Sequence, residues 1–276
     1  MASKGKQKKK KGRILITLLI ILIGAGLLCL MAIFMLYEIQ NLNVIGNRVL
    51  PKEEIIAQSG VKVGDNYFFL NRAKLKERLE KNRYIEFRGT QFDYSGTMNI
   101  KINERHAMGI IQRNGLYYVI DADGMVLENS QEVMPDFQCP IVKGLDLSSR
   151  TLIIEGQIIG VKDIEQLSAL SAVLKALDDT NMQGRTVSLD VSNLDNISIM
   201  TTEGAGIVLG RATDAELKLI IAREILASRE DKKELMGANI DVSSGEKAYF
   251  MPPVLPTVTP VPTTTPTPAP SATPKK

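Results

Sequence analysis

The layout of the chain is decided by residues 4–37, KGKQKKKKGRILITLLIILIGAGLLCLMAIFMLY. Seven of the first 13 residues are Lys or Arg, whereas the 24 residues from Ile14 to Tyr37 carry no charge. At a rise of about 1.5 Å per residue, a helix of this length extends roughly 36 Å, enough to cross a hydrocarbon core of ~30 Å. The stretch therefore predicts a transmembrane helix over residues 14–37, preceded by a basic tail over residues 1–13.

The charges beside this segment predict its orientation. Lys and Arg accumulate on the cytoplasmic side of membrane spans, so the N-terminus is expected in the cytoplasm and the remaining chain outside, as a single-pass type II protein. A cleaved signal peptide has a shorter apolar region and a small-residue cleavage site, and neither pattern is present. A basic run can also bind nucleic acid or anionic lipid. Because this basic run adjoins a membrane span, its roles in setting the orientation and contacting lipid are sufficient to explain it. We therefore expect no nucleic-acid partner.

The other end of the chain is set apart by proline. Residues 251–276 consist almost entirely of Pro, Thr, Val and Ala, apart from the terminal lysines. Proline at this density opposes both helix and sheet, so an extended, disordered tail is expected. Two roles stay open for it: a spacer through cell-wall material, and an inert extension.

Residues 38–106 have the pattern of a small unit that mixes helices and strands. Leu42 and Val44 alternate with polar residues, as in a half-buried strand. After one short helix, Asn71 is suited to cap a second one. Two strands follow, over Tyr84–Tyr94 and Thr97–Glu104. The expected order is β-α-α-β-β.

Residues 107–250 are richer in strands and form a second expected unit, so the whole fold class is α+β. Asn114-Gly115 is a strong hairpin signal between two apolar runs. Further strands are expected around residues 125–127, 187–191, 197–201, 207–209, 240–242 and 247–250. The sheet should be mixed or antiparallel, with helices flanking it.

Two helices of this second unit have candidate start signals. Asp163 is followed by Gln166 in the reciprocal capping position. Thr213 and Glu216 repeat this pattern ahead of the other helix. The periodicity of that second helix predicts that four apolar side chains face the core: Leu217, Ile220, Ile221 and Ile225.

The residues that could perform catalysis do not form a recognisable set. His106 is the single histidine, so a multi-histidine metal site is excluded, and a catalytic triad would need Cys139 or a serine beside it. Ser59 and Lys62 match the S-x-x-K signature, but Gly60 places the serine at a helix end, without the accompanying motifs. We therefore expect no catalytic residue, no bound metal and no cofactor.

Carboxylate and glycine clusters have simpler explanations. Asp121 and Asp123 could bind Ca²⁺ or act as an acid–base pair, but turn formation accounts for them as well. Gly204 and Gly206 resemble a relaxed nucleotide-binding loop, yet a strand follows them where a helix is required, which favours a hairpin.

The backbone of the last strand is the remaining candidate for function. It comprises Glu246, Lys247, Ala248, Tyr249 and Phe250, directly before the prolines. An edge strand has unpaired N–H and C=O groups that can accept a strand from another protein. Tyr249 and Phe250 would anchor that partner; alternatively, both aromatic rings pack inward.

The order of several short motifs resembles one bacterial family. These motifs are Leu42-Asn43-Val44-Ile45-Gly46-Asn47, Gly64-Asp65-Asn66-Tyr67-Phe68, Ile102-Asn103-Glu104-Arg105, Tyr118-Val119-Ile120-Asp121 and Asn239-Ile240-Asp241-Val242. They resemble, over residues 14–250, the cell-division proteins FtsQ/DivIB, which combine one span, a POTRA domain and a β domain. The chain departs from the family at Asn82-Arg83 and at His106-Ala107, where proline is usual.

The resemblance implies a non-enzymatic scaffold of the divisome at the division septum. Its partners would be FtsL-type and DivIC/FtsB-type bitopic proteins, and the complex would help control septal peptidoglycan synthesis close to the wall. The family pairs its partner with the last strand of the β domain, here Glu246–Phe250. The resemblance also implies a helix that flanks this site, with Asp214, Leu217, Lys218 and Ile221 as its candidate residues. The alternatives are a membrane-anchored wall-modifying enzyme and a POTRA-type envelope transport component.

Overall fold

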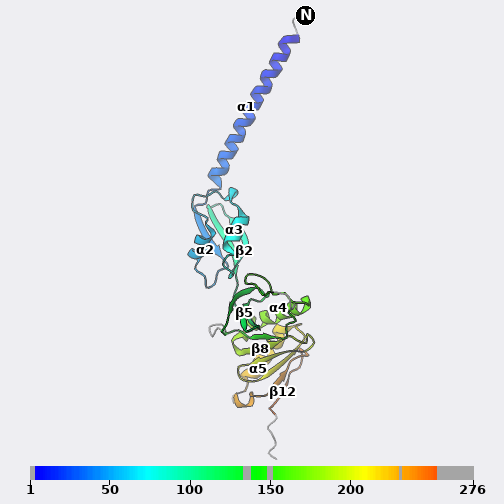
Figure 1. Ribbon diagram of the computed structural model, residues 1–276. Coiled ribbons are helices and arrows are strands. Elements are labelled where there is room, and N and C mark those ends of the chain that lie inside the picture. The colour runs from blue at the N-terminus through cyan, green and yellow to red at the C-terminus, as the bar shows by residue number, and fades with distance from the viewer. Residues whose placement is uncertain (1–3, 133–137, 148–151, 230–231, 254–276) are drawn as a thin grey trace, which may run out of the picture.

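The computed structural model describes residues 4–132, 138–147, 152–229 and 232–253. It is α+β, as expected, with one long N-terminal helix followed by two sheet-containing units in a row (Figure 1). We call these the first unit, residues 38–106, and the second unit, residues 107–253. Most of the predicted tail, residues 254–276, lies outside the described residues.

The N-terminal helix α1 spans Lys4–Leu36 and includes the apolar segment Ile14–Leu36. None of that segment is buried inside the protein, and in the described part of the chain it is the one helix long and apolar enough to cross a membrane. The predicted span ended at Tyr37, which lies instead in the turn just after the helix. An apolar helix with no protein cover is suited to lipid.

The first unit contains the predicted β-α-α-β-β order and one additional short helix. Its elements are β1 (Asn41–Ile45), α2 (Lys52–Ser59), the 3₁₀ helix η1 (Tyr67–Phe69), α3 (Arg72–Leu79), β2 (Ile85–Phe92) and β3 (Thr97–Glu104). The strand order is β1-β3-β2, with β1 parallel and β2 antiparallel to β3. Asn71 caps α3 as predicted, because its side-chain oxygen accepts the Lys74 N–H at 3.0 Å.

The second unit is built on a nine-stranded mixed sheet in the order β12-β11-β10-β9-β8-β7-β4-β5-β6. The strands are β4 (Gly109–Arg113), β5 (Leu116–Ile120), β6 (Val126–Ser130), β7 (Ile141–Lys143), β8 (Thr186–Asp190), β9 (Ile197–Thr201), β10 (Gly206–Gly210), β11 (Asn239–Asp241) and β12 (Tyr249–Met251). Helices α4 (Ile164–Asp179) and α5 (Ala215–Ala227) share one apolar core with this sheet. Short 3₁₀ helices η2 (Gln183–Arg185) and η3 (Lys232–Glu234) complete it.

Strand β7 was not predicted, although it connects the two halves of the large sheet. It pairs in parallel with β4 on one side and with β8 on the other. Its three residues, Ile141–Lys143, are too few to show a period-two pattern, and strands buried in parallel pairings do not need one.

Helix α4 begins at its predicted cap, but Gln166 has a different role from the one expected. Asp163 accepts the Glu165 N–H at 2.9 Å. The Gln166 side chain is buried and donates to the carbonyls of Gly144 and Val191, at 2.9 Å each. Buried carbonyls must find a protein donor, whereas the exposed Asp163 N–H can bind water. The prediction of a capping box was therefore wrong at Gln166.

The prediction for α5 was wrong in its cap and partly wrong in its buried face. The residue before α5 is Asp214, in the left-handed conformation (φ 54°) and without a capping side chain, so Thr213 and Glu216 do not form the box. Leu219, Ala222 and Leu226 are buried, whereas Leu217 is 52% exposed. Ala215, Leu219, Ala222 and Leu226 form a second apolar stripe at helical spacing, so spacing alone did not decide which stripe of α5 faces the core.

Candidate partner-binding edge

Strand β12 is the last strand of the large sheet and pairs antiparallel with β11. Among the described strands, β11 is its one neighbour, so its second side is open. The predicted strand began at Glu246, but β12 begins at Tyr249, and Glu246, Lys247 and Ala248 lie in the turn segment before it. There Lys247 donates its N–H to the Ser244 hydroxyl at 3.0 Å, and that hydroxyl donates to the Lys247 carbonyl at 2.8 Å. The turn therefore confines the strand to Tyr249–Met251.

The direction of the backbone groups follows from the pairing of β11 with β10. The Gly206 N–H donates to the Ala238 carbonyl at 2.9 Å, and the Val242 N–H donates to the Val208 carbonyl at 3.0 Å. In a parallel ladder these two bonds flank Ile240, whose own N–H and C=O therefore point toward β10.

The same alternation identifies the groups that face the open side of β12. Because Ile240 points toward β10, Asn239 and Asp241 point toward β12, where they pair with Met251 and Tyr249. Phe250 lies between those two pairs. Its N–H and C=O therefore point away from β11, toward the open side of the sheet.

The side chains of β12 alternate in the usual way, so its two aromatic residues have different surroundings. Tyr249 is 60% exposed and Met251 is 46% exposed. Phe250 packs against the core, and the Arg229 guanidinium lies 4.1 Å from its ring centroid. Only Tyr249 is available as an aromatic anchor, and the alternative in which both rings pack inward is wrong for it.

Helix α5 lies beside the turn that leads into β12, but not all of its candidate residues are accessible. Asp214 and Leu217 are exposed, and Ile221 is half-buried against the core. Lys218 is buried: its Nζ donates to the Arg211 carbonyl at 2.9 Å, and burial lowers its pKa. Lys218 therefore supports the fold here, while Asp214 and Leu217 remain on the surface.

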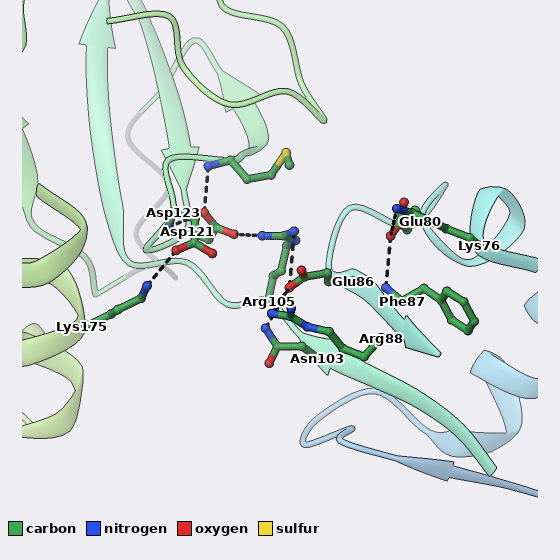
Figure 2. A network of polar contacts seen from close by, with 11 residues as sticks. Lys76, Glu80, Glu86, Phe87, Arg88, Asn103, Arg105, Asp121, Asp123 and Lys175 are labelled. Carbon is green, nitrogen blue, oxygen red and sulfur yellow. Dashed lines mark hydrogen bonds and ion pairs between the residues drawn. The ribbon is translucent and has the colours of Figure 1, made fainter. Parts of the chain in front are cut away.

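The two units are joined by a buried ion pair (Figure 2). Arg105, just past β3, donates to the Asp121 carboxylate, and the two side chains are only 12% and 7% exposed. Asp121 also accepts the N–H groups of Asp123 and Met125, at 2.9 and 2.8 Å. Arg105 reaches back to Glu86 of β2 at 3.5 Å. A single guanidinium thus connects the sheets of both units.

Two further polar contacts also connect the first unit to the second. The Tyr84 hydroxyl donates to the Glu128 carboxylate, and burial together with this bond raises the pKa of Tyr84. Arg83 pairs with Glu155 at 2.6 Å. With the Arg105 pair, these contacts hold the first unit against the second at several points, and β12 lies at the end of the molecule opposite α1 (Figure 1).

Both units match family descriptions from cell-division proteins. Residues 38–105 match the POTRA domain, FtsQ-type, and residues 109–243 match the cell division protein FtsQ/DivIB, C-terminal domain. The chain belongs to the FtsQ/DivIB family. This confirms the resemblance that the motifs indicated.

Curated relatives of this FtsQ/DivIB chain carry the same names. It is 27% identical to the cell division protein DivIB of Clostridium botulinum strain Hall over 239 residues, covering 86% of this chain and 90% of the relative. It is 28% identical to the cell division protein FtsQ of Syntrophotalea carbinolica over 171 residues, 61% of this chain and 55% of the relative.

One solved structure is also similar, the major extracytoplasmic domain of DivIB from Geobacillus stearothermophilus in its trans isomer. Its sequence identity to this chain is 14% and the TM-score is 0.31, covering 45% of this chain and 93% of that one.

The candidate nucleophiles of this FtsQ/DivIB chain are occupied by structural contacts. Ser59 is buried, and its hydroxyl donates to the Ile56 carbonyl at 2.6 Å. His106 lies 3.2 Å from the Asp178 carboxylate. Cys139 lines the same hollow of about 530 Å³ as His106, but its sulfur accepts from Gln183 at 3.1 Å. The structure therefore brings Cys139 and His106 into one hollow without joining them as a nucleophile and base.

The carboxylate and glycine clusters that the sequence offered as candidate sites form turns in the structure. Asp121 organises the turn at Asp123-Gly124 through its side-chain oxygen, and Gly204 lies in the turn between β9 and β10. Among the described residues, no group of three or more His, Cys, Asp or Glu is placed to hold a metal ion.

Cys139 should react slowly with alkylating reagents. Burial raises the pKa of its thiol to about 11, so very little thiolate exists at pH 8. In a Cys29→Ser background, iodoacetamide labelling at pH 8 should be about 100-fold slower for the folded chain than for the chain in urea, where the thiol regains a pKa of about 8.5. Equal rates, measured by mass spectrometry, would show that the fold does not raise the pKa of Cys139, and a faster rate in the folded chain would show that Cys139 is an activated thiol.

Proposed function

We propose that this chain is a non-enzymatic scaffold of the divisome at the division septum, where it binds FtsL-type and DivIC/FtsB-type bitopic proteins. In this role it helps control septal peptidoglycan synthesis. Membership of a family of cell-division proteins supports the general role, and the apolar α1 supports attachment to the membrane by a single span.

The observation that carries the binding proposal is the open side of β12. Phe250 directs its N–H and C=O toward that side, where no described strand pairs with them, and the exposed Tyr249 ring lies next to it in the strand. A partner strand could add to the sheet there, with main-chain hydrogen bonds providing affinity and a side-chain contact providing specificity. The exposed Leu217 of α5 offers a further apolar contact.

The short length of β12 limits what the partner can use. Pro252 and Pro253 follow Met251, and proline has no N–H to donate. The turn before the strand occupies Lys247. A partner strand therefore has a short backbone ladder, and we expect most of the remaining affinity to come from side chains such as Tyr249.

The proposed role in division can be tested by imaging and depletion. A fluorescent fusion of the full chain should form bands at midcell, and depletion should produce filaments without septa. A uniform envelope signal with normal division would contradict the proposal and favour a transport component. Peptidoglycan turnover by the purified extracytoplasmic part, abolished by a single carboxylate substitution, would contradict the non-enzymatic reading.

A further inference from the structure

The first unit is attached to the membrane helix almost without a linker. Helix α1 ends at Leu36, and Ile39 is already fully buried in the core of the first unit. Ile39 donates its N–H to the Asp65 carbonyl and accepts from Gly64, both at 2.8 Å. Two residues between a span and a folded core leave no room for the unit to move away from the bilayer surface.

The loop around η1 is fixed directly to the last turn of α1. The Asn66 side chain donates to the Ile33 carbonyl at 3.0 Å, which also accepts the Tyr37 N–H at 3.2 Å, so two donors meet at this carbonyl of the helix end. The Phe69 ring lies 5.2 Å from the Phe34 ring, centroid to centroid. Helical side chains lean toward the N-terminus of their helix, so the Phe34 ring lies on the bilayer side of its own backbone. Phe69 shares that depth.

The exposed aromatic residues of the described chain gather at this end of the first unit. Phe68 is 60% exposed and Phe69 is 54% exposed. Tyr94 is fully exposed in the turn between β2 and β3, where Gly96 accepts the Gln40 N–H at 2.8 Å. The exposed aromatics in the described residues are Phe34, Tyr37, Phe68, Phe69, Tyr94 and Tyr249. All except Tyr249 lie where the span meets the first unit.

We propose that Phe68 and Phe69 form a second membrane contact, inserting from the first unit into the interfacial layer of the bilayer beside α1. Exposed aromatic rings are costly in water and favourable at the level of the lipid headgroups. The exposed Arg72 at the start of α3, whose guanidinium lies 5.0 Å from the Tyr67 ring, is placed to face anionic headgroups beside the same loop. The contact is independent of the proposed partner site.

The consequence is that the extracytoplasmic part has a defined tilt on the membrane. A single membrane helix allows the attached units to rotate and tilt relative to the bilayer. Two aromatic rings inserted beside the helix restrict both motions. The ion pair of Arg105 and Asp121 then transmits this orientation to the second unit. The open side of β12 is therefore presented in a restricted direction, away from the bilayer.

The absence of tryptophan from the chain allows a direct test. Phe69→Trp and, separately, Phe68→Trp should be prepared in the full chain and reconstituted in vesicles of phosphatidylcholine and phosphatidylglycerol. The matched control is Val49→Trp, because Val49 is 86% exposed on the same unit but follows the far end of β1. Lipids brominated near the glycerol end of the acyl chain serve as the quencher.

Either Phe68→Trp or Phe69→Trp, or both, should show blue-shifted tryptophan emission. The brominated lipid should quench roughly half of that emission, whereas the emission of Val49→Trp should not be quenched. Emission typical of solvated indole from both variants, with quenching no greater than in the control, would overturn the proposal. Blue-shifted emission without quenching would also overturn it, because the rings would then be covered by protein.

Discussion

Replacing Asp121 by Ala should lower the free energy of unfolding of the two folded units by about 3–5 kcal/mol. The substitution leaves the Arg105 guanidinium, 12% exposed, without its main carboxylate partner at the junction of the two units. It also removes the acceptor for the N–H groups of Asp123 and Met125. Denaturant unfolding followed by circular dichroism would measure the loss.

An exposed ion pair provides the control for this prediction. Asp146 pairs with Lys162 at 2.7 Å, but both side chains are more than half exposed, so Asp146→Ala should cost less than about 1 kcal/mol. Adding Arg105→Ala to Asp121→Ala should recover part of the stability, because the unpaired buried charge is removed. Equal effects of Asp121→Ala and Asp146→Ala would mean that the junction pair does not hold the units together.

Replacing Phe250 by Pro should weaken binding of the proposed DivIC/FtsB-type partner by about tenfold or more, through loss of one strand-to-strand hydrogen bond and through the added ring. Phe250→Ala is the matched control, because both variants lose the aromatic ring and its contact with Arg229, but only proline lacks the outward N–H. Co-purification of the full-length chain with the partner would measure the difference.

Comparing the two variants separates the effect of the lost backbone N–H on binding from the effect of the lost side-chain packing on stability. Phe250→Ala should cost about 1–3 kcal/mol of stability through lost packing and yet retain partner binding. Equal binding by Phe250→Ala and Phe250→Pro, with both chains folded, would contradict strand addition at β12. Tyr249→Ala, which keeps the whole backbone, should produce an intermediate loss because it removes the exposed ring.

Local patterns in the sequence predicted most of the elements and few of the long-range contacts. Strands β3 and β9 were predicted with the bounds that the structure shows, because their apolar residues alternate with polar ones in part and turn residues flank them. Gln166 had the correct spacing for a cap but instead satisfies carbonyls that come from distant segments. Such contacts depend on which strands become neighbours, and spacing along the chain does not contain that information.

The sequence predicted that the last strand is the candidate partner site. The direction of its backbone N–H and C=O groups became clear only from the structure. The prolines after Met251 indicated where the sheet ends, so a terminal edge strand could be expected from the sequence. Which residue of β12 directs its N–H outward depends on the parallel pairing of β10 with β11, and parallel partners cannot be inferred from hairpin signals. The junction pair escaped prediction for a similar reason, since Arg105 and Asp121 are both typical turn or surface residues until the two units meet.

Amide hydrogen exchange at Phe250, with and without the DivIC/FtsB-type partner, tests strand addition most directly. In the free chain this N–H faces the open side of β12 and should exchange rapidly. When the partner binds, strand addition predicts that exchange at Phe250 slows by about tenfold or more, because the N–H becomes part of a ladder. Binding of the partner with no change in exchange at Phe250 would contradict the account.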